Sequence, residues 1–217
     1  MLPPVAIVWP CTLSVDEYVA AGRTAAVPRP DCPACTTTMS FWSGYERSVR
    51  QSGQCHKLWV RRARCGRCRA SHALVPSFCL LGRLDVVDDI GELIAEVVRG
   101  DTGVRPPAER INVPHTTARD WVRRFARRAA VLAAGFAAVV VEVSGIAPTL
   151  TAELPRLALE AIEAAFDTVR CRAGPALSGM WSFASLVTGG GLLATTTNPP
   201  WFVLGRRRFI PPVPPGH

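Results

Sequence analysis

The sequence predicts a mostly α-helical protein with one small β unit near its N-terminal end. Three observations support this fold class. Two strand-like runs surround a turn within residues 41–64, and a C-x2-C pair lies just outside each run. From residue 85 onward the apolar residues recur at helical spacing. A pattern of helix, turn and helix then occupies residues 103–128.

Composition and charge restrict the class of protein and its partners. The 217 residues are 48% hydrophobic, as in a folded globular chain, and the formal net charge is +8. Residues 41–84 carry nine basic residues against one acidic residue, and residues 105–128 carry a net charge of +5. Residues 85–104, between these two blocks, carry a net charge of −5. Two separate basic blocks favour a polyanionic partner.

The sequence predicts a cytoplasmic protein with no membrane partner. The first residues lack the basic region of a signal peptide, and the longest apolar run, residues 131–143, contains Glu142. A membrane-spanning helix needs about 20 apolar residues, so this run is too short. Because thiols stay reduced in the cytosol, the 8 cysteines are interpreted as metal ligands and buried thiols rather than as disulfides.

Residues 1–30 are predicted to form a lead-in of one strand and one helix. Ser14 is placed as the N-cap of that helix, Glu17 at the capping-box position and Gly22 as the stop. Residues 31–80 follow as a β ribbon. Within it, "FWSGYERSVR" and "CHKLWVRRAR" contain aromatic and β-branched residues in alternation around "QSGQ", which predicts a hairpin.

The two C-x2-C pairs lie at the ends that this hairpin would bring together. The four cysteines are Cys32, Cys35, Cys65 and Cys68. Four thiolates in a tetrahedral array suit zinc, which prefers soft ligands and has no further geometric demand. Apolar residues are few in this region, so a structural zinc ion would contribute on the order of 10 kcal/mol to its folding. Residues 31–80 are therefore predicted to be a zinc ribbon with one structural zinc ion.

Other ligands and other roles for the cysteines stay open at this point. His72 follows Cys68 by four residues and is a reserve ligand, as are Cys55 and His56, which are more readily placed as strand residues. Separate buried thiols or a thioredoxin-like redox pair are alternatives, but neither explains why the pairs flank a hairpin. Four thiolates leave no open coordination position, which argues against a catalytic zinc. The remaining cysteines, interpreted as buried thiols, are Cys11, Cys79 and Cys171.

Residues 84–130 are predicted to form a three-helix core that contains a helix-turn-helix. The first helix covers about residues 85–98, and a short second helix covers about residues 105–111. Ala108 is the small residue that allows close helix packing, and Asn112 occupies the turn, where a positive φ is needed. The apolar residues that lock the following helix are Ile111, Val113, Ala118 and Trp121.

The helix that starts near residue 115 presents a basic face, which predicts contact with double-stranded DNA. Arg119 and Arg123 are placed to reach base edges, because arginine near a recognition-helix N-terminus can enter the major groove. The residues placed on phosphate are Arg105, Arg124, Arg127 and Arg128, and the set is completed by His115 and Thr116. In the alternative interpretation this is a solvated surface helix in an ordinary bundle, and His115 only caps or packs the helix start.

Residues 131–200 are predicted to be a helical C-terminal region. The apolar stripe that starts at Trp121 continues to Val143, and a further helix is predicted over residues 151–170. The phrase "GMWSFASLV" adds a short last helix. The long stripe either pairs two subunits in a homodimer or packs inside one chain. Residues 201–217, basic and proline-rich, are predicted to be disordered.

Several phrases of the sequence carry a family resemblance. "RRARCGRC" followed by "GVRPPAERINVPHTTARDWVRRF" resembles the N-terminal DNA-recognition region of bacterial insertion-sequence transposases. "CPAC", "FWSGYERSVR" and "SHALVPSF" are similar to a family of uncharacterised transposon-associated bacterial proteins with a zinc ribbon and a helix-turn-helix but no nuclease. The resemblance covers about residues 5–128, and "WSFASLVTGGGLLATTT" more loosely. It implies a mobile-element context and a transposase or recombinase as partner.

Three function classes follow from these patterns. The leading one is a zinc-dependent, sequence-specific DNA-binding protein, a transposition accessory factor or transcriptional regulator associated with the nucleoid. The second is a compact or truncated transposase, which would need three carboxylates on an RNase H-like fold to bind two Mg2+ ions. The acidic residues available after residue 128 are Glu142, Glu153, Glu160, Glu163 and Asp167. Because four of them share one predicted helix, an enzyme is not expected. The third class is a protein- or RNA-binding module.

Overall fold

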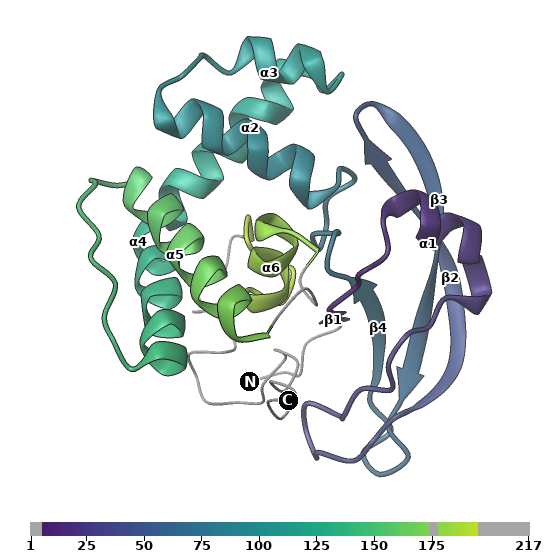
Figure 1. The fold of residues 1–217 in the computed structure, drawn as a ribbon. Helices are drawn as coiled ribbons and strands as arrows, with labels where there is room; N and C mark the ends of the chain where they lie inside the picture. The colour runs from purple at the N-terminus through teal and green to yellow at the C-terminus, as the bar shows by residue number, and fades with distance from the viewer. Residues whose placement is uncertain (1–5, 174–177, 195–217) are drawn as a thin grey trace.

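The computed structural model describes residues 6–173 and 178–194, which form four strands and six α-helices (Figure 1). The strands are β1 (Ala6–Trp9), β2 (Ser40–Gln51), β3 (Gln54–Arg64) and β4 (Ser71–Pro76). The helices are α1 (Val15–Ala21), α2 (Val87–Arg99), α3 (Arg105–Arg110), α4 (His115–Ser144), α5 (Arg156–Ala173) and α6 (Met180–Val187).

The four strands form one mixed sheet in the order β1-β4-β3-β2. Strands β2, β3 and β4 are antiparallel neighbours, whereas β1 runs parallel to β4, with Ala6 opposite Ala73. Helix α1 lies in front of the hairpin in Figure 1, and its Tyr18 donates a hydrogen bond to the Trp59 carbonyl at 3.0 Å. Tyr18 is fully buried, so α1 and the sheet share one apolar core.

The predicted fold class is wrong. A mostly helical protein with an N-terminal zinc ribbon followed by a helix-turn-helix core does not describe this chain, because the hairpin is the outer half of a larger mixed sheet. The sheet has its own core, which includes residues of β1, α1 and β4. The error has a physical cause. Strand β1 pairs with β4 across about 67 residues of chain, and no local pattern encodes such a pairing.

The hairpin is also tied to the segment that leads into α2. The Arg47 guanidinium donates to the carbonyl oxygens of Leu80 and Arg83, each at 2.7 Å. At the hairpin tip, the Ser52 amide donates to a carboxylate oxygen of Asp89 at 2.5 Å. These hydrogen bonds join the hairpin to the segment before α2 and to the first turn of α2.

The helices enclose a second core, in which α4 and α5 pack side by side (Figure 1). The apolar stripe of α4 lies inside this core: Trp121, Phe125, Ala129, Leu132, Phe136 and Val139 are each no more than 1% exposed. Of the two alternatives for this stripe, the structure shows packing within one chain. The predicted homodimer therefore stays a prediction, and the apolar stripe of α4 no longer supports it.

Helix α6 lies between the sheet and the other helices, and one glycine makes its position possible (Figure 1). The Trp181 indole packs directly on the backbone of α2 at Gly91, where an added Cβ would lie 2.0 Å from the ring carbon Cδ2. The same indole donates to Glu92 Oε1 at 3.0 Å. Gly91 thus lowers the helix propensity of α2 but allows the closest contact between α2 and α6.

Several local predictions are confirmed. Ser14 and Glu17 form the capping box of α1, and α2 ends at Gly100, whose φ is 85°. The hairpin, the long helix α4 and the short helix α6 also form where the patterns predict them. Helix α5 begins at Arg156, five residues later than predicted. The predicted disordered tail, residues 201–217, lies outside the described residues.

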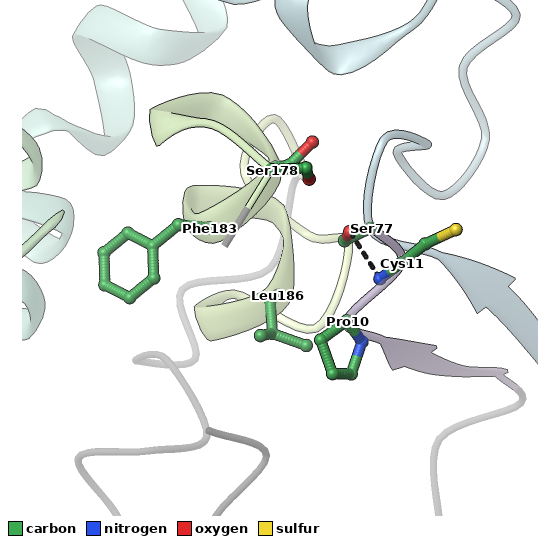
Figure 2. Close-up of a pocket in the computed structure, with 7 residues that line it drawn as sticks. Pro10, Cys11, Ser77, Ser178, Phe183 and Leu186 are labelled. Carbon is green, nitrogen blue, oxygen red and sulfur yellow. Dashed lines mark hydrogen bonds between the residues drawn. The ribbon is translucent and has the colours of Figure 1, made fainter. Parts of the chain in front are cut away.

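A small crevice between β1 and α6 is the hollow shown in Figure 2. Pro10, Ser178 and Leu186 line it, and at its side the Cys11 amide donates to Ser77 Oγ at 3.2 Å. The crevice is too narrow to admit a water molecule. It is therefore a packing seam and not a ligand site.

Within residues 6–173 and 178–194, none of the helices has the length and apolar character of a membrane span.

Candidate metal centre and nucleic-acid interface

The structure gathers four cysteine side chains from two separate segments. Their sulfur atoms all lie within 4.8 Å of one another, and the four residues are Cys32, Cys35, Cys65 and Cys68. Across the two segments, Cys32 Sγ lies 3.4 Å from Cys68 Sγ, and Cys35 Sγ lies 3.3 Å from Cys65 Sγ. No disulfide joins them. The four cysteines could hold a metal ion.

Each C-x2-C pair sits in a turn with the same hydrogen-bond pattern. In the first turn the Cys32 amide donates to the Thr37 carbonyl, and the Thr36 amide donates back to the Cys32 carbonyl, both at 2.9 Å. In the second turn the Cys65 amide donates to the Ala70 carbonyl at 2.9 Å, and the Arg69 amide donates to the Cys65 carbonyl at 3.1 Å. The two turns are therefore equivalent backbone cradles that face each other.

Both cradles contain a residue in a conformation that side chains rarely adopt. Thr36 has a φ of 65° and Arg69 has a φ of 64°, at equivalent positions after the two C-x2-C pairs. For residues other than glycine, such a conformation costs on the order of 1 kcal/mol each. Strain of this kind persists only where the surroundings impose it, and it clusters at functional sites. The two turns therefore match in backbone conformation as well as in hydrogen bonding.

The thiols of the cluster differ in acidity. Hydrogen bonds from the backbone and side chain of Thr37, and from Cys65, lower the pKa of Cys35 to about 6. For Cys68, the backbone of Ala70 lowers the pKa, but the contact with Cys32 and burial outweigh it and raise the pKa to about 11. A thiolate at Cys35 is thus available at neutral pH, and thiolates are the form that binds metals.

The dimensions of the cluster fit a four-coordinate metal. A tetrahedron with metal–sulfur bonds of about 2.3 Å has edges of about 3.8 Å, within the range of the separations found here. Four sulfur ligands in this geometry suit zinc or iron and not magnesium or calcium. Cys32 and Cys65 are fully buried, which limits exchange with solvent.

The structure places the reserve ligands and the other cysteines elsewhere. His72 is buried on β4 opposite Ala63 and is not part of the cysteine cluster. Cys55 and His56 are residues of β3, as expected for strand residues. Cys11 and Cys79 are buried thiols, as predicted. Cys171 is exposed, so its predicted burial is wrong.

Basic side chains lie beside the second pair of the cysteine cluster. Arg64 precedes Cys65 directly, and Arg67 and Arg69 are exposed residues of the second cradle. Four thiolates around a divalent ion carry a net charge of −2, and neighbouring arginines offset that charge. The same arginines make the outer surface of this turn electropositive.

A second basic surface runs along the first half of α4. His115, Arg119, Arg123 and Arg127 are all exposed, and they follow one another at steps of four residues. Residues four apart are neighbours on the helix surface, so the four form a band that winds slowly round the helix and spans about 18 Å. We call these four residues the α4 row.

The turn before α4 has the predicted geometry. Asn112 has a φ of 52°, and the Val113 amide donates to the Ala108 carbonyl at 2.9 Å. The tip of the hairpin lies against this turn, because a Cβ on Gly53 would lie 2.8 Å from the Asn112 Cβ. The start of α4 is therefore supported from the sheet side as well as by α2.

Asp120 pairs with one arginine of the α4 row and with one arginine outside it. Its carboxylate accepts hydrogen bonds from Arg123 at 2.7 Å and from Arg124. The bond from Arg124, followed by that from Arg123, lowers the pKa of Asp120 to about 2. Asp120 is thus ionised at neutral pH and pairs with both guanidinium groups.

The remaining predicted contact residues differ in their availability. Arg105 is exposed on α3 and lies 4.0 Å from Glu109, while Thr116 is exposed in the first turn of α4. The half-buried Arg128 donates to the carbonyl oxygens of Gly191 and Ala194. Its guanidinium is therefore engaged within the chain, where it ties α4 to the segment after α6.

Three of the five carboxylates considered for an active site have structural partners. Glu163 pairs with Arg99 at 2.6 Å, and Asp167 pairs with Arg170 at 2.9 Å on the same helix. Glu160 accepts hydrogen bonds from the backbone amides of Thr151 and Ala152. In the part of the chain that the structure describes, the cluster of metal-ligating side chains is the cysteine group.

Sequence reasoning missed two features near these surfaces. One is the ion pair between Arg50 on β2 and the buried Asp85 before α2, which joins the two cores. The other is a set of arginine–aromatic contacts on the hairpin, among them Arg62 and Arg64 on the exposed Trp42. The aromatic residues interleaved with arginines in "FWSGY" and "KLWVRRAR" were the available signal for the second feature.

One known domain family matches part of the chain. A domain of unknown function, DUF6431, matches residues 32–121. The match begins at the first cysteine of the cluster and ends within the first turns of α4, so it includes all four cysteines and Arg119. No curated protein and no solved structure matches the chain. The resemblance to transposases therefore remains a prediction.

Proposed function

We propose that this protein is a zinc-dependent, sequence-specific DNA-binding protein that reads double-stranded DNA with the first half of α4. The α4 row carries this proposal: four basic or titratable side chains at steps of four, all exposed, on a helix whose opposite face is locked in the core. Arginines held in such a row can reach base edges through a bidentate contact with guanine.

We assign the residues of the α4 row to two kinds of DNA contact according to their position along the helix. Arg119 and Arg123 lie nearer the helix N-terminus and are assigned to base edges, with His115 and Thr116 beside them. Arg127, one turn further, is assigned to phosphate, as are Arg105 on α3 and the half-buried Arg124. Both Arg123 and Arg124 pair with the Asp120 carboxylate, which places their guanidinium groups next to each other.

Zinc is the proposed metal, and its role is structural. The four sulfur ligands would occupy every position of a tetrahedral ion, so no site would be left for a substrate or water. The metal would close the open end of the hairpin, whose other end supports the turn before α4 at Gly53 and Asn112. The sheet thus connects the metal centre to the DNA-reading helix.

The proposed biological context is a mobile element. This part of the proposal rests on the resemblance of "RRARCGRC" and "GVRPPAERINVPHTTARDWVRRF" to the DNA-recognition region of transposases. The protein would act as a transposition accessory factor or a transcriptional regulator, with a transposase or recombinase as its partner.

Variants of the α4 row test the proposal through salt dependence and specificity. We expect Arg123→Ala to weaken binding to the preferred duplex by about 1–3 kcal/mol and to relax the sequence preference at one position. Arg127→Ala should weaken binding to all duplexes by a similar factor and should reduce the slope of log K against log salt by about 0.9. Fluorescence anisotropy of labelled duplexes over a series of salt concentrations measures both effects.

Arg170→Ala is the matched control, because Arg170 is an exposed helical arginine on α5, outside the α4 row. It should leave affinity, specificity and salt slope unchanged. If single-stranded RNA of random sequence competed as well as every duplex tested, the protein would be an RNA- or protein-interaction module and the proposal would fail.

A further inference from the structure

The hairpin exposes a tryptophan that is held in a fixed orientation. Trp42 on β2 is 53% exposed, although tryptophan is mostly buried in folded proteins. Its Nε1 donates to Ser71 Oγ on β4 at 3.0 Å, so the side chain reaches across β3 to the far strand. The indole is thus presented to solvent by a contact that restricts its rotation.

A β-bulge creates this position. The register between β2 and β3 shifts between Phe41 and Ser43, and Trp42 is the extra residue on the bulged strand. Bulges redirect a side chain that regular pairing would place elsewhere, and they are frequent next to functional sites. The bulge leaves Trp42 without a partner residue on β3.

Two arginines lie against the Trp42 ring. The guanidinium carbons of Arg62 and Arg64 are 5.6 Å and 5.5 Å from the ring centroid. They are two residues apart on β3 and therefore on the same face of the sheet. We call Trp42, Arg62 and Arg64 the Trp42 platform.

The surroundings of the platform are electropositive. Arg64 directly precedes the metal-site residue Cys65, and the exposed Arg67 and Arg69 follow in the second cradle. Residues 41–84 as a whole carry a net charge of +8. An aromatic face next to a row of arginines is complementary to a base with its flanking phosphates.

We propose that the Trp42 platform binds an unpaired segment of DNA, with one base stacked on Trp42 and the adjacent phosphates held by Arg62, Arg64 and the cradle arginines. An unpaired strand is the occupant that fits, because base pairs in a duplex hide the base faces that an indole can stack on. The choice of DNA over RNA as the bound strand rests on the proposed function. The inference that Trp42 offers a surface for base stacking does not depend on that function. The platform is separate from the α4 row and binds a different form of the nucleic acid.

Binding of labelled oligonucleotides by the metal-loaded protein tests this inference. The probes are a dT12 single strand, an rU12 single strand and a mixed-sequence duplex, followed by fluorescence anisotropy. Trp42→Ala should weaken binding of dT12 by about 5- to 150-fold, which is the range for loss of one stacked base, and should leave duplex binding unchanged. Trp42→Phe, which keeps an aromatic face, should stay within a few-fold of the wild type.

Control variants separate stacking from charge and from misfolding. Arg64→Ala should weaken dT12 binding, whereas Arg170→Ala should not, although Arg170 also lies over an aromatic ring, that of Phe166 at 5.4 Å. If Trp42→Ala loses the fold by circular dichroism, Arg64→Ala and Trp42→Phe decide the test. Unchanged dT12 binding in the folded Trp42→Ala variant, an equal loss for duplex and single strand, or tighter binding of rU12 than of dT12 would each overturn the inference. Loss of duplex reading by Arg123→Ala is independent of these outcomes, so the two proposals can fail separately.

Discussion

Replacement of Cys65 by serine is expected to abolish stoichiometric metal binding and to lower the melting temperature by at least about 10 °C. Cys65 is fully buried, and its sulfur lies 3.3 Å from that of Cys35 in the cluster. Structural zinc sites contribute on the order of 10 kcal/mol to folding, and even a third of that value corresponds to about 10 °C for a chain of this size. The two strained cradles lose the interaction that holds them together.

Metal analysis and thermal unfolding measure this effect together. The wild-type protein should contain about one equivalent of zinc, and removal of the metal by a chelator should reproduce the loss of stability seen for Cys65→Ser. Cys55→Ser is the matched control, since Cys55 is an exposed cysteine on the same strand pair and outside the cluster. This variant should keep the metal and the melting temperature.

Two results would contradict the metal assignment. One is a Cys65→Ser protein that still binds one equivalent of metal, which would place the ligands elsewhere. The other is a wild-type protein that takes up neither zinc nor cobalt. Substitution with cobalt gives a further check, because four thiolates around this ion produce a characteristic visible absorption.

The second large effect is expected at the ion pair between the two cores. Asp85 is 4% exposed and accepts two hydrogen bonds from the Arg50 guanidinium, at 2.6 Å from Nε and 3.1 Å from Nη2. The hydrogen bonds to Asp85 raise the pKa of Arg50 above its usual value, so this arginine stays charged at any pH at which the protein folds. Asp85→Ala would leave that charge partly buried without its partner.

Loss of one partner of a buried pair costs about 3–5 kcal/mol, and we expect Asp85→Ala to lower the free energy of unfolding by that amount. Urea denaturation measures the change. Asp167→Ala provides the comparison, because its pair with Arg170 is exposed and such pairs contribute about 0–1 kcal/mol. The double variant Arg50→Met with Asp85→Leu should recover much of the loss, since it removes the charge as well as the partner.

If Asp85→Ala cost no more than Asp167→Ala, the pair would not join the two cores. The main-chain bonds beside it make such a result unexpected. The Arg50 amide donates to the Leu84 carbonyl at 2.8 Å, and the Val86 amide donates to the Arg50 carbonyl at 2.9 Å. The Arg50–Asp85 ion pair thus adds to main-chain hydrogen bonds that already join the same two segments.

Elements with a local pattern could be predicted from the sequence. The capping box at Ser14 and the stripe of α4 depend on residues within a few turns of each other. The cysteine cluster also belongs to this class, because a hairpin brings together its own ends and the C-x2-C pairs lie at those ends.

Features that depend on distant contacts could not be predicted. Strand β1 has only four residues, and its parallel partner β4 lies far along the chain, so the mixed sheet was missed. In the sequence, Asp85 is one of several acidic residues in the block 85–104, and only the structure shows that it forms an ion pair with Arg50. The sequence likewise could not distinguish Arg128 from its exposed neighbour Arg127. Only the structure shows that Arg128 donates a hydrogen bond to a carbonyl oxygen in the segment after α6.

The central claim is that the first half of α4 reads a DNA sequence, and selection of bound duplexes from a random DNA pool tests it most directly. The zinc-loaded wild-type protein should enrich one sequence motif, and the Arg119→Ala, Arg123→Ala double variant should not, while it keeps its fold and its metal. Enrichment of no motif by the wild type, or of the same motif by the double variant, would contradict the account.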